Sequence, residues 1–247
     1  MPRLNKYIAS TGLCSRRKAD ELILEGKVSV NGKIINELGF YVREKDKVEV
    51  EGKTVKPQKL EYYRFYKPAG YITTQEDEKG RKTIYDVIPP ELKHLKPVGR
   101  LDKDSTGLLI LTNDGELINQ MTHPSIKVPK VYMVTINGRF TEDNAKSMFD
   151  GIEIVTDTNE KKMAYAECLP IEVTNKSSII QVTLYQGINR QIRKMFAKLG
   201  FEVVVLKRIQ HAIVTLEGIK KGQVKLMKPK LVKQLQGYLA KIQKEQV

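Results

Sequence analysis

The chain has 247 residues, 40% of them hydrophobic, so it can bury a substantial core in one large domain or two modest ones. Forty-three Lys and Arg residues against 29 Asp and Glu residues give a formal net charge of +14 at pH 7. Cys14 and Cys168 lie far apart and the three histidines form no cluster with them, which disfavours a disulfide framework and a metal site. Without a signal core or a long apolar run, we expect a cytoplasmic protein with no membrane partner.

The excess positive charge lies at the two ends of the chain. Residues 1–60 carry 13 basic and eight acidic side chains, residues 218–247 carry eight basic and one acidic, and the middle is nearly balanced. Basic flanks indicate a polyanionic partner, because neutralising phosphates releases counterions. The alternative is that the charge serves solubility alone.

The first segment predicts two short helices followed by a hairpin. The apolar positions assigned to the first helix, which Gly12 ends, are Leu4, Ile8 and Leu13. Ser15 is placed to cap the second helix, and Gly26 to close it. Asn31–Gly32 then predicts a tight primed turn between two strands. The glycines nearby do not have phosphate-loop spacing, so no nucleotide cofactor is indicated.

Three cations occupy the first turn of the second helix. Arg16, Arg17 and Lys18 stand where the helix dipole and free backbone amides favour acidic side chains. Amides and cations together at a helix start form a phosphate site. The alternative is a solvated basic face without a ligand.

The stretches RLNKYIA, SRRKA and GKVSVNGK occur in that order, and residues 2 to about 50 resemble the small αL RNA-binding fold. This fold occurs in a small-subunit ribosomal protein and in several RNA-modifying enzymes. The RNA contacts that the resemblance implies are Arg3, Lys6, Arg16, Arg17 and Lys18. We place this domain at residues 1–57 and a second domain at 58–247.

The second domain is rich in short strands. The expected strands are YRFYK, LLILT, VYMVTI, IEIV, MAYAECL, SIIQVTLY, EVVVLKRI and AIVTL, with helices at about 115–122, 142–150, 190–199 and from 229. Few helices between many strands indicate an α+β fold with a largely antiparallel sheet flanked by helices. The amphipathic helix from 229 either packs on this domain or adds RNA contacts.

Asp102 is the first candidate for chemistry. It lies in GRLD, directly before an apolar strand, which favours a fixed carboxylate at a sheet edge; a turn role is the alternative, and we assign that role to Asp104. Arg190 and Arg193 lie on the basic face of the helix at 190–199. A buried arginine near Asp102 would lower the pKa of that carboxyl. The alternative is a solvated helix face.

Tyr132 is the second candidate. In a strand it shares a face with Lys130, Val134 and Ile136. A strand aromatic usually fills a core. A ring beside an ionised aspartate can instead stack on a flipped base and offer a hydroxyl for proton transfer.

The stretches YKPAGYITT, GRLDKDSTGLLILTNDGEL, KVYMV and LYQGINRQIRKMFAKLGFEVVVLKRI are similar, in order, to the motifs of the ribosomal-RNA pseudouridine synthases. Members of this family carry an αL domain ahead of the catalytic one, and the resemblance spans essentially the whole chain. It implies that Asp102 starts glycosidic cleavage and that Arg100 enters the RNA and displaces the uridine. Tyr132 would stack on uracil. Arg193 would pair with Asp102, beside Ile192 in the pocket. Arg190 is a further expected RNA contact.

The stretch MTHPSIKVPKVYMVTINGRF is similar to the subgroup that acts on large-subunit ribosomal RNA. The expected function is therefore isomerisation of uridine to pseudouridine, without a cofactor, by a monomer acting on ribosomal RNA or an assembly intermediate. A small-subunit synthase, a binding-only ribosome-assembly factor and a base-excising glycosylase are the alternatives. A protein that had lost catalytic activity should lack at least one of Asp102, Tyr132 and Arg193, and all three are present.

Overall fold

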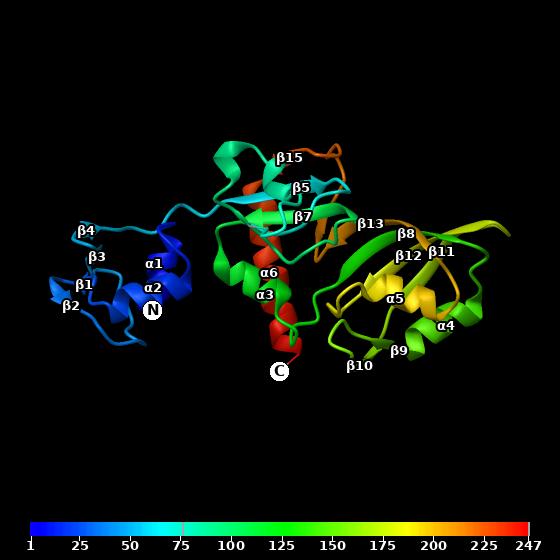
Figure 1. The fold of residues 1–247 in the computed structure, drawn as a ribbon, viewed down its shortest axis with the longest axis horizontal. Coiled ribbons are helices and arrows are strands. Elements are labelled where there is room, and N and C mark those ends of the chain that lie inside the picture. Colours follow the sequence, from blue (N-terminus) through cyan, green and yellow to red (C-terminus); the bar gives the residue numbers. More distant parts are fainter. Residues whose placement is uncertain (76, 247) are drawn as a thin grey trace. The chain divides into compact units, whose positions relative to one another are not determined.

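The computed structural model describes residues 1–75 and 77–246. It divides into two compact units, which we call the N-terminal unit (1–61 with 113–115) and the C-terminal unit (62–112 and from 116 onward) (Figure 1). Each is described by itself. Among the described residues, no helix is long and apolar enough to cross a membrane.

The N-terminal unit packs two helices on a small antiparallel sheet. Its elements are α1 (Leu4–Ser10), α2 (Arg16–Leu24), β1 (Val28–Val30), β2 (Lys33–Ile34), β3 (Val48–Val50) and β4 (Lys53–Thr54), with the strand order β2-β1-β3-β4. Leu4, Ile8 and Ile23 from the helices are buried against Val28 and Val48 of the strands. The apolar spacing that predicted the helices therefore forms this core.

Two details of the N-terminal unit differ from expectation. Leu13 was assigned to the first helix, but α1 ends at Ser10 and Leu13 is 54% exposed. The Asn31–Gly32 turn is confirmed, with both residues at positive φ. The sequence did not predict a second turn of the same kind at Glu51–Gly52, because a glutamate seldom adopts positive φ.

The C-terminal unit is built on a nine-stranded sheet (Figure 1). Its strands are β5 (Tyr62–Lys67), β6 (Lys96–Pro97), β7 (Thr106–Thr112), β8 (Lys130–Asn137), β11 (Glu167–Val173), β12 (Ser177–Leu184), β13 (Val203–His211), β14 (Val214–Thr215) and β15 (Val224–Leu226). The helices are α3 (Gly115–Thr122), α4 (Glu142–Asp150), α5 (Gln191–Lys198) and α6 (Pro229–Glu245), with short η1 (Ile84–Asp86) and η2 (Pro90–Leu92). The main path runs β11-β12-β8-β13-β7-β5-β15, and among the strand pairs of the described chain only β13 and β7 are parallel. The expected α+β fold is confirmed.

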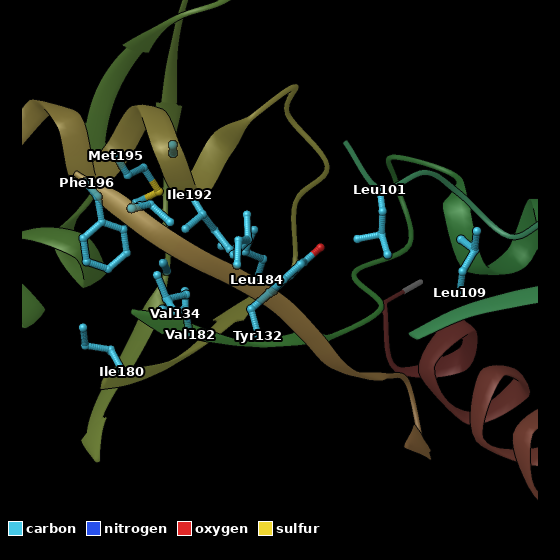
Figure 2. Close-up of a cluster of buried hydrophobic side chains, with 14 of the residues drawn as sticks. Leu101, Leu109, Tyr132, Val134, Ile180, Val182, Leu184, Ile192, Met195 and Phe196 are labelled. Atoms are coloured by element: carbon cyan, nitrogen blue, oxygen red, sulfur yellow. The ribbon is translucent and has the colours of Figure 1, made fainter. Parts of the chain in front are cut away.

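Strand β7 is buried on both faces. Leu109 and Leu111 join one apolar cluster, which includes the α5 side chains in Figure 2, while Leu108 and Ile110 join another. Because successive strand side chains point to opposite faces, both sets are covered. The uninterrupted apolar run of this strand is thereby explained.

Two expectations for this unit are decided by packing. The single strand expected at MAYAECL is wrong: β10 (Lys161–Ala164) pairs with β9 (Ile152–Val155) in a separate hairpin, and β11 starts a new edge strand at Glu167. Helix α6 packs on the C-terminal unit through Leu235 and Leu239. Its lysines stay exposed.

Candidate active site

A buried lysine donates hydrogen bonds to the backbone of the loop that carries Asp102. Lys67, at the end of β5, is fully buried, and its Nζ donates to the carbonyl oxygens of Pro68 (3.1 Å), Asp102 (2.9 Å) and Ser105 (2.9 Å). Three acceptors match the three protons of a charged amine. The loop backbone is therefore fixed at Asp102 and at Ser105.

Burial also affects the charge of this lysine. It lowers the pKa of Lys67 to about 8, with Asp102 and Asp104 acting in the opposite direction and Arg208 adding to the decrease. Cations and carboxylates thus share one small region at the start of β7.

Gly107 allows the two parallel strands to approach closely at this point. Its φ is +113°, and it pairs with Arg208 of β13. A Cβ at position 107 would collide with the Arg208 backbone, whose nitrogen would lie 2.6 Å away. The glycine therefore brings Arg208 next to the loop that carries Asp102.

A pocket of about 1020 Å³ opens between these elements. Four expected site residues line it together with Asp102, namely Arg100, Tyr132, Arg190 and Ile192. Arg100 is exposed and Asp102 is half-buried, whereas Tyr132 and Ile192 are 9% and 4% exposed. Figure 2 shows Tyr132 and Ile192 on one side of the cluster and Leu101, next to Asp102, on the other.

Arg193 does not pair with Asp102, which corrects our expectation. Its Nε lies 3.1 Å from Oδ2 of Asp104, an ion pair without an aligned hydrogen bond. Its Nη1 donates to the carbonyl of Val203 at 2.9 Å, and its Nη2 to that of Asp104 at 3.4 Å. The first turn of α5 faces Asp104, so the Arg193 guanidinium already has protein partners there.

Asp104 is more than a turn residue. Arg190, in the left-handed conformation before α5, donates from Nη1 and Nη2 to the two Asp104 carboxylate oxygens, each at 3.2 Å. Burial alone would raise the pKa of the Asp104 carboxyl, but the Arg190 hydrogen bond and the Arg193 charge lower it overall. Two arginines of one helix start thereby tie α5 to the loop.

The carboxylate of Asp102 forms no ion pair with any of the residues that the structure describes. With Arg190 and Arg193 both on Asp104 and the Lys67 amine on the backbone carbonyls, the Asp102 carboxylate lies in the pocket without a direct ion pair to a described residue. An aspartate placed in this way is open to a substrate atom.

Sequence reasoning missed a basic group on the same sheet face as Tyr132. Arg208 is 1% exposed and lies opposite Tyr132 in the β13–β8 register, while His211 lies opposite Lys130. All four line the pocket. The sequence did hold one signal for this group. Arg208 lies two residues after Leu206, which faces the core, and a cation is unexpected on that face of the strand.

The environment alters two of these groups. Burial and then the charge of Arg208 lower the pKa of Lys130 to about 8. Burial, followed by the charges of Arg208 and Lys130, lowers the pKa of His211 well below 6.5. The His211 ring is therefore neutral at pH 7.

The residues expected to contact RNA at the second helix lie in the N-terminal unit. Arg16, Arg17 and Lys18 are exposed in the first turn of α2, which contains no acidic residue. The Ser15 side chain caps this helix by accepting from the Lys18 amide at 3.2 Å. Lys18 also pairs with Glu21 at 2.7 Å, so Arg16 and Arg17 are the more available cations.

The other two expected contacts lie at and in α1. Arg3 precedes the helix, and a hydrogen bond with Tyr41 raises the pKa of its guanidinium. Lys6 lies within the helix and is half-buried.

Comparison with known proteins relates both units to families. Residues 61–198 match the RNA pseudouridylate synthase family, and residues 2–48 match the S4 domain. The chain belongs to the RNA pseudouridine synthase family. It has RNA pseudouridine synthase activity, which is an isomerisation, and carries an S4 domain for RNA binding.

Individual relatives of this synthase match over most of its length. Ribosomal large subunit pseudouridine synthase B of Bacillus subtilis (strain 168) is 41% identical over 95% of this chain and 96% of its own. The dual-specificity RNA pseudouridine synthase RluF of Escherichia coli (strain K12) is 38% identical over 90% of this chain and 73% of its own. A crystal structure of pseudouridylate synthase has a TM-score of 0.68 at 27% identity, covering 95% of this chain and all of that one.

Proposed function

We propose that this synthase isomerises uridine to pseudouridine in ribosomal RNA, and specifically in large-subunit RNA. The name of the 41% identical Bacillus subtilis relative supports the substrate, as does the basic S4 domain. The observation that carries the site is that Asp102, free of ion pairs with the described residues, shares one pocket with Tyr132.

Asp102 starts the reaction. It either attacks the anomeric carbon of the target uridine or takes a proton from the neighbouring sugar carbon, and the bond from the sugar to the uracil nitrogen breaks. The uracil turns in the pocket and rejoins the sugar through carbon 5, which loses its proton. The atoms of the nucleotide are conserved, so the pocket must chiefly exclude water from the intermediate.

The other side chains hold the uridine and open the RNA. Tyr132 stacks on the uracil and takes part in removing the carbon 5 proton, with Ile192 beside it in the pocket wall. Arg100, exposed at the pocket, enters the RNA stack in place of the extruded base. Arg193 acts through Asp104 and positions the loop that carries Asp102.

The S4 domain supplies affinity for the RNA around the target. Its expected contacts are Arg3, Lys6, Arg16, Arg17 and Lys18. Extruding a base costs a few kcal/mol, which contacts to several phosphates offset.

Mapping pseudouridines in cells with and without the gene tests the substrate. We expect one uridine of large-subunit RNA to be unmodified in cells without the gene. A gene-dependent site in small-subunit RNA would instead favour a small-subunit synthase. The map should cover all stable RNA, since one relative is named a dual-specificity enzyme.

Substitution of Asp102 tests the chemistry. Asp102→Asn and Asp102→Ala should abolish pseudouridine formation while RNA affinity stays near that of the wild type. Turnover by the asparagine variant would overturn the assignment. Mass spectrometry separates isomerisation, which leaves the RNA mass unchanged, from excision by a glycosylase.

A further inference from the structure

Two cations on adjacent strands line the sheet face of the pocket, and neither forms an ion pair with a residue that the structure describes. Lys130 of β8 and Arg208 of β13 belong to adjacent strands, and both line the cavity that contains Asp102. Arg208 is 1% exposed; its Nε donates to the Leu108 carbonyl at 2.7 Å, but its Nη2 has no hydrogen-bond partner among the described residues. Such a buried, unsatisfied donor is destabilising unless a ligand accepts a hydrogen bond from it.

Lys130 is the more accessible of the two. It is half-buried, and its Nζ has a long 3.4 Å contact with the Val128 carbonyl. Burial and then the charge of Arg208 lower the pKa of Lys130 to about 8, so the two positive charges repel each other. Close like charges of this kind favour binding of an anion between or above them.

The aspartates of the pocket do not neutralise this pair. Asp157 lies 2.6 Å from Lys194, and Asp102 forms no ion pair with a described residue. His211, opposite Lys130 in the sheet, is fully buried and neutral. The sheet face of the pocket therefore carries net positive charge in the part of the chain that the structure describes.

We propose that Lys130, with Arg208 fixed behind it, forms a subsite for a phosphodiester of the extruded uridine. The inference rests on the proposed function, because the sugar that meets Asp102 brings its two phosphodiesters with it. A uracil carbonyl is a weaker match, since a neutral dipole does not offset the repulsion between two cations as a full negative charge does.

Measuring RNA affinity while changing the protein and the RNA, separately and together, tests this subsite on the whole chain. The RNA is a fragment that contains the mapped target uridine and carries a neutral methylphosphonate 5′ to the target, 3′ to it, or several nucleotides away. For the wild type, one adjacent methylphosphonate should weaken binding by about tenfold or more, the order expected for a lost buried charge contact. Lys130→Met should weaken binding of unmodified RNA equally and be insensitive to that methylphosphonate.

Three variants complete the test. Lys130→Arg should restore most of the affinity and the methylphosphonate sensitivity. Lys127→Met, at an exposed position three residues earlier, should behave as the wild type. Arg208→Lys should reduce the methylphosphonate effect, and thermal denaturation shows whether each variant is folded.

Other outcomes overturn the proposal. If Lys130→Met keeps the full methylphosphonate sensitivity, no phosphodiester binds there. If it binds RNA normally but loses turnover, Lys130 belongs to the proton-transfer chemistry. Should no ribosomal RNA uridine depend on the gene, the proposed function fails separately. The subsite is then tested by titrating uridine 5′- and 3′-monophosphates, which should bind more tightly than uridine only when Lys130 is present.

Discussion

The Nε of Arg193 lies 3.1 Å from Oδ2 of Asp104, two residues beyond the aspartate with which it was expected to pair. Together with the two 3.2 Å contacts from Arg190, this ion pair connects the start of α5 to the loop before β7. Asp104 therefore links two segments that are far apart in sequence, and Asp102 is left free for a substrate.

Breaking this link should slow catalysis without removing the reacting group. We expect Asp104→Asn and Arg193→Met each to reduce kcat by about tenfold or more, since a displaced loop misplaces Asp102. Arg193→Met leaves the Arg190 contacts to Asp104 in place, whereas Asp104→Asn weakens the contacts of both arginines, so the double variant should be little worse than Asp104→Asn alone. A double-mutant cycle on kcat checks this, and fully additive losses would mean that Arg193 acts independently of Asp104.

Gly107→Ala should destabilise the C-terminal unit by more than about 3 kcal/mol. The new Cβ would collide with the backbone of Arg208, and φ at this position is +113°. Neither strand can move away without breaking its buried pairing. Urea denaturation measures the loss. Gly222→Ala, also at positive φ but with no atom within 4 Å of the added Cβ, is the matched control and should lose much less.

His211 should make the C-terminal unit less stable at low pH. Its pKa is lowered in the folded protein, so below about 6.5 the unfolded chain binds a proton that the folded protein does not. Stability should fall by about 1.4 kcal/mol per pH unit from this group as pH drops below that value. His211→Gln should reduce the slope between pH 6.5 and 5.5, which urea denaturation across that pH range measures.

Arg16 and Arg17 should contribute to the salt dependence of RNA binding. If each neutralises one phosphate, Arg16→Gln with Arg17→Gln should reduce the slope of log K against log salt by about 1.4 to 1.8. Filter binding to ribosomal RNA at several salt concentrations measures this. Lys45→Gln with Lys53→Gln removes two exposed charges elsewhere in the same unit, and an equal change there would indicate only a general charge effect.

Local patterns predicted most of the elements. Helix α4 begins after Thr141 and ends before Gly151, as the capping rules predict, and Asn31–Gly32 forms the expected turn. Both signals act between residues that are close in sequence. The split of MAYAECL was not predictable in this way. Whether Ala164 and Glu167 belong to one strand depends on the partners β9 and β12, which come from other parts of the chain.

The family, the α+β class and the candidates Asp102 and Tyr132 were predictable from the sequence, because ordered motifs and apolar periodicity are properties of the chain. The folded arrangement was needed to show that Arg193 binds Asp104, that Lys67 holds the Asp102 loop, and that Arg208 is buried on the strand next to that of Lys130. Ion pairs and burial depend on distances across strands and helices, and a basic side chain looks the same in a sequence whether it faces solvent or a pocket.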